Sequence, residues 1–305
     1  MNSKTIMVCL LLFAGLTACQ KKEESVNIPI SNIKINTPVP EPKLIALQDI
    51  KSLSDKSDAA IDNKHLEELS GITPAMEKNQ FWGHNDKGNA SELFRFDLNG
   101  KVHQKIKLKG IKNDDWEAIE RDNDGYLYLG GFGDNEEKRA VYRIHRIKEP
   151  DSNAKKVDQI ESFSFKYSDA QSHNCEAFFI FNDNFYLITK VDKKNKSSKP
   201  EIYRLSKQNE GFTNTAVRLG SFTIDGVVTD AVYLESHECL VVLTYSNIAF
   251  YSVEKESDLL SKPISVIDID FGQCEAIGVN GNNIVITNEK GQIWQYGIDR
   301  FIINK

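Results

Sequence analysis

Five short segments of the chain share one pattern, an acidic residue followed by a small residue and then an apolar one, and this repeat constrains the fold most. The first segment matches less well, because Leu69 stands between its acid and the small residue Ser70. The acids are separated by 45 to 59 residues, and each motif is followed by a turn and by further runs rich in β-branched and aromatic residues. Helical periodicity is nearly absent from residue 44 onward. The five acids are Glu68, Glu117, Glu176, Asp230 and Glu275.

A unit of four strands that recurs at roughly 50 residues is typical of a β-propeller. We therefore predict an all-β fold, a β-propeller of five four-stranded blades, although a sixth blade could be hidden in the longer units. The last unit begins at Glu275 and ends after its third strand. The strand-like run 43–50 can supply the missing outer strand, which closes the ring and removes two sheet edges. A β-sandwich is the alternative, and a fivefold repeat of one motif argues against it.

The first residues predict the compartment. Lys4 precedes a short apolar run, 6–15, and the segment Leu16-Thr17-Ala18-Cys19 resembles a bacterial lipobox. In such signals a diacylglycerol is attached to the cysteine and the chain is cut just before it. We expect a signal peptide at 1–18, a lipid-bearing Cys19 with a tether at 19–42, and one propeller domain at 43–305. An ordinary cleaved signal with an incidental cysteine is the alternative.

Gln20 is not the aspartate associated with inner-membrane retention, so we expect an outer-membrane lipoprotein, on either face of that membrane. The chain has 38 basic and 44 acidic residues, and its net charge of -6 argues against bulk attraction to nucleic acid or to anionic lipid, while leaving a local basic patch open. We expect a monomer whose partners are the membrane, through Cys19, and a small molecule or an envelope protein. Three cysteines in apolar strand-like runs are predicted to be buried free thiols: Cys175, Cys239 and Cys274.

The repeated acids open the first strand of each predicted blade, and in a propeller that strand lines the central channel. Carboxylates that converge on one rim cannot all stay ionised and unpaired. They can bind a cation such as Ca²⁺, which prefers oxygen ligands, pair with Lys or Arg, or brace loops by accepting backbone N–H groups. Because consecutive strands are antiparallel, the ends of the second strands reach the same rim. That rim is predicted to include Glu68, His84, Asn85, Asp86, Asp134, Asn135 and Glu289, with Arg139 and Lys190 as candidates for pairing.

Three motifs resemble a known group of proteins: Phe-Trp-Gly-His-Asn-Asp at 81–86, Asp-Trp-Glu-Ala-Ile at 115–119, and Gly-Phe-Gly-Asp-Asn at 131–135 with Arg139. They resemble secreted bacterial propellers of the group that contains esterase-like phytase domains and SdiA-regulated proteins, and more distantly the gluconolactonase and strictosidine synthase propellers. The resemblance covers about residues 66–300. Characterised members use a divalent cation at the top of the channel to hydrolyse esters, phosphoesters or lactones. Transferred to this chain, that implies Ca²⁺ or another divalent cation held among Glu117, Glu176, Asp230 and Glu275.

Two hypotheses about function follow. In the first, the protein is a cation-dependent hydrolase in which Glu117 and Glu176 act as ligand or general base, and Arg139 or Lys190 steadies the developing negative charge. In the second, the protein is a non-catalytic scaffold that binds a ligand or a protein in the cell envelope, and the acids brace loops. The sequence leaves open whether the protein is an enzyme.

Overall fold

The computed structural model describes residues 46–48, 50, 52–62, 66–191, 199–207 and 213–303. The predicted signal peptide, Cys19 and the tether lie outside these residues. The described part is all-β, as predicted, and its helical structure is confined to three short 3-10 helices. They are η1 (Glu235–His237), η2 (Glu256–Leu260) and η3 (Ile298–Arg300). No helix among the described residues is long and apolar enough to cross a membrane.

Most strands belong to antiparallel meanders, in which each strand pairs with the next. The first meander contains β3 (Leu69–Pro74), β4 (Gln80–Asn85), β5 (Glu92–Asp97) and β6 (Val102–Leu108). The second contains β7 (Trp116–Arg121), β8 (Tyr126–Gly131), β9 (Tyr142–Lys148) and β11 (Glu161–Tyr167). The third contains β12 (Cys175–Phe181), β13 (Asn184–Thr189), β14 (Glu201–Ser206) and β15 (Thr213–Ser221). The fourth contains β16 (Val228–Leu234), β17 (Cys239–Thr244), β18 (Asn247–Ser252) and β19 (Ser265–Asp268), and the last contains β20 (Cys274–Asn280), β21 (Asn283–Asn288) and β22 (Gln292–Gly297).

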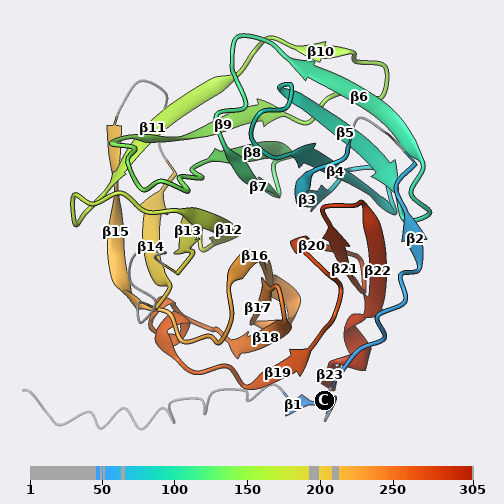
Figure 1. The fold of residues 1–305 in the computed structure, drawn as a ribbon, viewed down its shortest axis with the longest axis vertical. Coiled ribbons are helices and arrows are strands. Elements are labelled where there is room, and N and C mark those ends of the chain that lie inside the picture. Colours follow the sequence, from blue (N-terminus) through green and yellow to red (C-terminus); the bar gives the residue numbers. More distant parts are fainter. Residues whose placement is uncertain are drawn as a thin grey trace, which may run out of the picture. The chain divides into compact units, whose positions relative to one another are not determined.

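The meanders are arranged with their first strands together. In Figure 1 the strands β3, β7, β12, β16 and β20 lie around the centre, and the last strand of each meander lies on the outside. Each first strand contacts the first strand of the next meander, and β20 contacts β3. Two parallel pairings join the outer strands. The pairing of β11 with β15 makes one eight-stranded sheet of two meanders, and β10 (Lys156–Val157) adds to β6.

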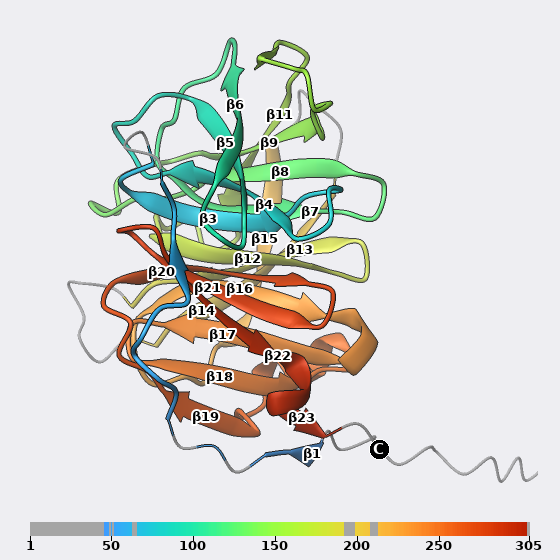
Figure 2. The same cartoon turned by 90° about the vertical axis from the view of Figure 1, so that its right-hand side faces the viewer.

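An N-terminal strand pairs with the last meander, but it is not the run 43–50. Strand β2 (Ala59–Ala60) pairs with β22, whereas β1 (Ala46–Leu47) pairs with β23 (Ile302–Ile303) in a separate two-stranded sheet. Between them Ser52 forms a bridge with Asp268 at the end of β19. Figure 2 shows this segment running from β1 past β19 toward β2.

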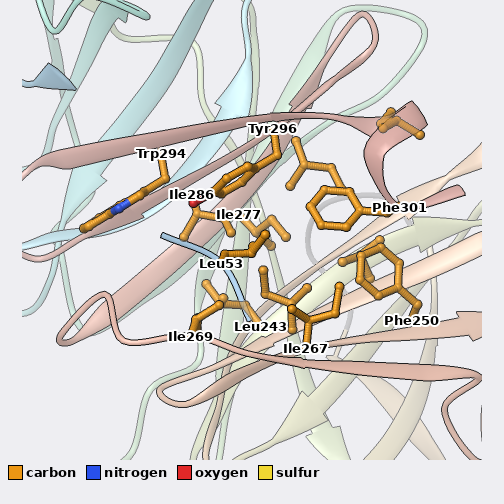
Figure 3. Packing of buried hydrophobic residues seen from close by; sticks show 14 of the residues in the cluster. Leu53, Leu243, Phe250, Ile267, Ile269, Ile277, Ile286, Trp294, Tyr296 and Phe301 are labelled. Atoms are coloured by element: carbon orange, nitrogen blue, oxygen red, sulfur yellow. The ribbon is translucent and has the colours of Figure 1, made fainter. Parts of the chain in front are cut away.

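The displacement of the pairing strand has a packing cause. Leu53 lies in a hydrophobic cluster between the fourth and last meanders, together with Ile267 and Ile277 (Figure 3). In the same cluster the rings of Phe271 and Trp294 stack with centroids 4.4 Å apart. Because Leu53 is buried at this interface, the chain reaches β22 only several residues later.

Burial follows the position of a strand in its meander. In β6 exposed and buried residues alternate, because only one face of the strand is covered. In β17 all six residues are buried, because neighbouring meanders cover both faces of the sheet. Cys175, Cys239 and Cys274 lie in such strands and are buried and free, which confirms that prediction.

Candidate functional site

A β-bulge near the start of each first strand positions the site. The pairing with the second strand skips one residue, always the second of the strand. A bulge leaves that residue unpaired and redirects its side chain. The skipped residues are Ser70, Glu117, Glu176, Thr229 and Glu275.

This register separates Asp230 from the other acids. Thr229 occupies the bulge of β16, so Asp230 takes the position that Ala118, Ala177 and Ala276 hold in their own strands. Its carboxylate accepts the backbone N–H of Ala231 at 2.8 Å and that of Ile277, in the neighbouring strand β20, at 2.9 Å. Burial raises the pKa of Asp230 well above its usual value. The structure therefore places Asp230 in the wall between two meanders rather than among the side chains of the site.

A cavity of about 420 Å³ opens where the first strands begin and the second strands end. The residues that directly follow the second strands contribute to it, which agrees with the predicted approach of these two sets to one rim. The polar residues that line it are Glu68, Ser70, Asp86, Glu117, Asn135, Glu176, Lys190, Tyr245, Glu275 and Glu289.

Three carboxylates converge beside this cavity, and two of them, Asp86 and Glu117, line it. One oxygen atom from each of Asp86, Asp115 and Glu117 lies within 4.8 Å of the others. Asp86 follows β4, Asp115 precedes β7, and Glu117 is the bulge residue of β7. The Oδ2 atom of Asp115 accepts a hydrogen bond from Lys87 Nζ at 2.7 Å, whereas its buried Oδ1 atom has no hydrogen-bond partner among the described residues. We refer to Asp86, Asp115 and Glu117 as the carboxylate triad.

The electrostatics of the triad favour an added positive charge. Burial raises the pKa of Glu117 well above its usual value, and the charges of Glu176, Asp86 and Asp115 raise it further. Burial also raises the pKa of Asp86 to about 6, and the neighbouring Asp115 adds to this shift. Each ionised form is therefore disfavoured until a cation compensates the charge.

A glycine makes room for the triad. A Cβ atom at Gly133 would lie 2.7 Å from the carboxyl carbon of Asp115 and would overlap Oε1 of Glu117. Gly133 has no positive φ, so its role here is spatial rather than conformational. Any larger residue at this position would displace two of the three carboxylates.

A second polar group faces the triad from the third meander. Lys190, directly after β13, forms an ion pair with Oε1 of Glu176 at 2.9 Å. The side-chain amide of Asn174 donates to the same oxygen at 2.7 Å. Burial would lower the pKa of Lys190, but the charges of Glu176, Tyr245 and Glu275 and the hydrogen bond to Glu176 together raise it. Glu176 and Lys190 thus form a charged pair at the cavity.

Glu275, from the last meander, has a different protonation state. Burial raises its pKa to about 8, although Lys190 opposes the shift. The hydroxyl group of Tyr245, directly after β17, donates to Oε1 of Glu275 at 2.9 Å. At neutral pH Glu275 is therefore largely a neutral acid beside the charged pair.

Arg139 and Asp134, two other residues predicted for the site, stabilise loops near the cavity. Arg139 donates to the carbonyl oxygens of Gly131 and Gly133 and pairs with Asp114. Asp134 is buried, and its Oδ2 atom accepts the backbone N–H groups of Lys138 and Arg139 and the hydroxyl of Tyr142. Neither Arg139 nor Asp134 lines the cavity, so the structure gives both of them a loop-bracing position.

Some of the remaining predicted rim residues line the cavity, and the others lie behind it. Glu68, Asn135 and Glu289 line the cavity, and the side-chain amide of Asn89 donates to Glu68 at 2.6 Å. His84 is fully buried beneath Gly71, and burial lowers its pKa to about 4. The Oδ1 atom of Asn85 accepts the backbone N–H of Glu68 at 3.2 Å, which fixes the start of β3.

Sequence reasoning missed Asp115, Ser70 and Tyr245. Tyr245 could have been found, because it follows the second strand of its meander at the same position as Asp86, Lys190 and Glu289. Ser70 is identified only by the bulge in the pairing of β3 with β4, which the sequence does not show. Asp115 opens the motif at 115–119 on which the resemblance depends, but it is not one of the repeated acids, and the repeat does not predict its backbone φ of 106°.

The model of the SdiA-regulated family matches residues 51–195, just under half of the chain. No curated protein matches. Among solved structures, a gluconolactonase from Xanthomonas campestris is 10% identical, with 75% of this chain and 71% of that chain covered and a TM-score of 0.44. The PQQ-bound aldose sugar dehydrogenase from Streptomyces coelicolor is 9% identical, with 79% and 96% covered and a TM-score of 0.48.

The family match contains all three motifs on which the predicted resemblance depends, at 81–86, 115–119 and 131–135. It also contains the carboxylate triad and the pair of Glu176 with Lys190. The predicted resemblance to the group of propellers that includes SdiA-regulated proteins is thus confirmed over residues 51–195.

Proposed function

We propose that this protein is a divalent-cation-dependent hydrolase of esters or lactones. Its active site is the cavity where the first strands begin. The observation that carries the proposal is the carboxylate triad, whose oxygens lie within 4.8 Å of one another. The motifs that resemble the hydrolytic propellers supply Asp86, Asp115 and Glu117.

The triad fits a hard cation such as Ca²⁺. Its donors are all carboxylate oxygens, which Ca²⁺ prefers. The buried Oδ1 atom of Asp115 has no hydrogen-bond partner among the described residues, and such an atom is costly unless something binds it. The space that a Cβ atom at Gly133 would fill is kept open beside two of the three carboxylates. Lys87, whose side chain is 59% exposed, can turn outward when a cation takes over its role.

The chemistry follows from the groups that surround the cavity. A bound divalent cation would polarise the carbonyl oxygen of the substrate. Glu176, which is ion-paired with Lys190, can accept the proton of an attacking water. Lys190 stays protonated and stabilises negative charge that develops near Glu176. Glu275, with a pKa of about 8, holds a proton that it can give to the leaving oxygen.

The first test is metal content. The purified protein should hold about one divalent ion per chain, and Asp115→Asn or Glu117→Gln should lower its Ca²⁺ affinity at least about tenfold. Asp230→Asn is the matched control, because Asp230 braces β20 and lies outside the cavity. It should keep the ion. A protein without a bound ion, whose melting temperature does not change on addition of Ca²⁺, would contradict the proposal.

A second candidate function, a non-catalytic binding scaffold, is favoured by one observation. The acidic repeat includes one member, Asp230, that only accepts backbone N–H groups. Glu176→Gln distinguishes the two functions. In a hydrolase it should lower kcat by about 10²-fold or more on a lactone or ester substrate. A scaffold would turn over no member of a substrate panel before or after this change.

We also propose the architecture of the domain that contains this site and the location of the protein in the cell. The five meanders correspond to five blades of one closed propeller, with β2 as the outer strand of the last blade. This proposal is supported by the contact of β20 with β3 and by the pairing of β2 with β22. The propeller is monomeric and is held at the outer membrane by the lipid on Cys19. Its ligand is a small molecule or an envelope protein at the cavity.

A further inference from the structure

The outward face of strand β6 carries only basic residues. From 101 to 109 every second residue is exposed, and Gln104, Ile106 and Leu108 between them are buried. Because side chains alternate along a strand, the exposed residues point to one side. They are Lys101, His103, Lys105, Lys107 and Lys109.

Strand β10 extends this basic face. It pairs parallel to β6, with Lys156 directly opposite Lys107, and Lys155 precedes it. A shallow depression of about 500 Å³ brings Lys105, Lys107 and Lys155 together. Like charges directly opposite each other destabilise a sheet, so this arrangement has a cost in the isolated protein. We call Lys101, His103, Lys105, Lys107, Lys109, Lys155 and Lys156 the basic strip.

The strip keeps a surplus of positive charge. Three carboxylates reach it: Glu92 pairs with Lys105 at 2.7 Å, Asp97 with His103 at 2.8 Å, and Asp158 with Lys156 at 3.2 Å. Four lysines form no ion pair with any residue that the structure describes: Lys101, Lys107, Lys109 and Lys155. This surplus stands out in a chain whose net charge is -6.

Protection of a sheet edge does not account for the strip. Lysines often guard exposed edges against pairing with other chains. However, β10 already covers part of β6, and the outer strands of the other meanders carry at most one exposed basic residue each, Lys166 in β11 and Arg218 in β15. The exposed residues at the corresponding positions are Thr213, Thr215 and Val217 in β15, and Val266 and Asp268 in β19. The basic face is therefore particular to β6 and β10.

We propose that the basic strip docks the protein on the surface of an anionic lipid bilayer. The charge of the strip is complementary to such a surface. A segment of 26 residues separates Cys19 from β1, and it can span at most about 90 Å, so a lipid on Cys19 does not by itself fix which face of the domain is turned to the membrane. A charged face can then decide which side is turned to the bilayer. Because β6 and β10 lie on the outside in Figure 1, docking leaves the central cavity uncovered.

The test uses the chain from Gln20 onward, which lacks the predicted lipid and retains every residue that the structure describes. Binding is measured by co-sedimentation with vesicles that contain phosphatidylglycerol, and pure phosphatidylcholine vesicles are the neutral reference. Since each lysine near an anionic surface contributes about 1 kcal/mol, or roughly fivefold, Lys107→Gln with Lys155→Gln should weaken binding by about tenfold or more. Binding should also fall with added salt.

A matched control removes the same charge elsewhere. Lys166→Gln with Lys262→Gln changes two exposed lysines outside the strip and should leave binding within about twofold. Circular dichroism checks that all variants are folded. The proposal is overturned by equal binding to both kinds of vesicle, or by equal losses in the strip and control variants. It is also overturned if duplex DNA binds at the same salt concentration while the anionic vesicles do not.

Discussion

Glu275 and Asp230 lie near the starts of equivalent strands, β20 and β16, one residue apart in register. Glu275 is the bulge residue and lines the cavity, whereas Asp230 lies one position further on and accepts two backbone N–H groups. A β-bulge decides which way a side chain is directed, so the same chemical motif performs two tasks. At the scale of single residues, the position relative to the bulge, rather than the charge, therefore decides whether a repeated acid lines the cavity.

The first residue-scale prediction concerns Gly133. Gly133→Ala should lower the affinity for Ca²⁺ by about tenfold or more, because the new methyl group would displace the carboxylates of Glu117 and Asp115. Isothermal titration with Ca²⁺ measures this. Gly220→Ala is the control, since its Cβ atom would meet only the flexible end of Leu260, at 3.1 Å. Unchanged Ca²⁺ affinity in the Gly133 variant would show that the ion is bound elsewhere.

The second concerns Glu120, a partly exposed residue of β7 whose carboxyl group loses enough hydration in the fold to raise its pKa to about 8. An acid with a raised pKa in the folded state contributes stability below its unfolded pKa, near 4.5, and that stability is lost as the pH rises toward 8. Glu120→Gln removes this loss. The free energy of unfolding of the variant should therefore exceed that of the wild type by an amount that increases between these two pH values. The difference should reach about 2–4 kcal/mol at pH 8 and then level off.

Urea unfolding over the pH range measures the free energy of unfolding for both proteins. Glu67→Gln, at an exposed position, serves to show the effect of removing one charge on its own. A constant difference between Glu120→Gln and wild type across the pH range would show that the carboxyl group of Glu120 is solvated in the folded protein.

How far the sequence predicts the site also depends on residue-scale detail. The acids of the repeat and the residues after the second strands were both expected at one rim, and Asp86, Glu117, Glu176, Lys190 and Glu275 do line one cavity. A repeat reports spacing along the chain. It does not report the bulge that moves Asp230 or the backbone of Asp115, since both depend on contacts between strands.

At the scale of elements, the N-terminal segment ties the first and last parts of the chain together. After Leu53 enters the cluster of the last two meanders, the backbone N–H of Asp58 bonds Ile293 and that of Ile61 bonds Gly291. The N–H of Asp62 then reaches the carbonyl oxygen of Gly100, in the turn between β5 and β6. This segment therefore bridges the last meander and the first.

This bridge gives an element-scale prediction. Ile61→Pro removes the N–H that bonds the carbonyl oxygen of Gly291 at 2.8 Å, and should lower the free energy of unfolding by about 1–3 kcal/mol. Ile61→Val keeps the N–H and most of the apolar contact, and should cost less than about 1.5 kcal/mol. Chemical denaturation compares the two variants. Equal losses would mean that side-chain packing, rather than the strand pairing, carries the stabilisation.

The elements themselves were the most predictable part of the fold. Alternating and buried apolar runs predict strands from local chemistry, and the repeat predicts their grouping. The run 43–50 was assigned to the last sheet because it is apolar and precedes the first motif. Its actual partner, β23, and the use of Ala59 and Ala60 instead depend on where Leu53 packs, which no local pattern encodes.

At the scale of the whole molecule, the net charge of -6 averages two opposite features. Carboxylates gather at the cavity, and lysines gather on the outer face of β6 and β10. Separation of charge in this way lets one protein attract a cation at its centre and an anionic surface at its side. The cavity and the basic strip can therefore act independently, and the proposed lipid on Cys19 would contribute to membrane binding separately from the strip.

The whole-molecule prediction concerns that attachment. Cys19→Ser removes the thiol that would carry the lipid, so the protein should move from the detergent-extracted membrane fraction to the soluble fraction of disrupted cells. Cys9→Ser, within the apolar part of the signal, is the matched control and should leave the protein in the membrane fraction. Fractions are compared by immunoblot after a high-salt wash, because salt screens any attraction of the basic strip to the bilayer. A Cys19→Ser protein that stays with the membrane after this wash would contradict lipid anchoring, whereas one that leaves only on addition of salt would show the strip acting alone.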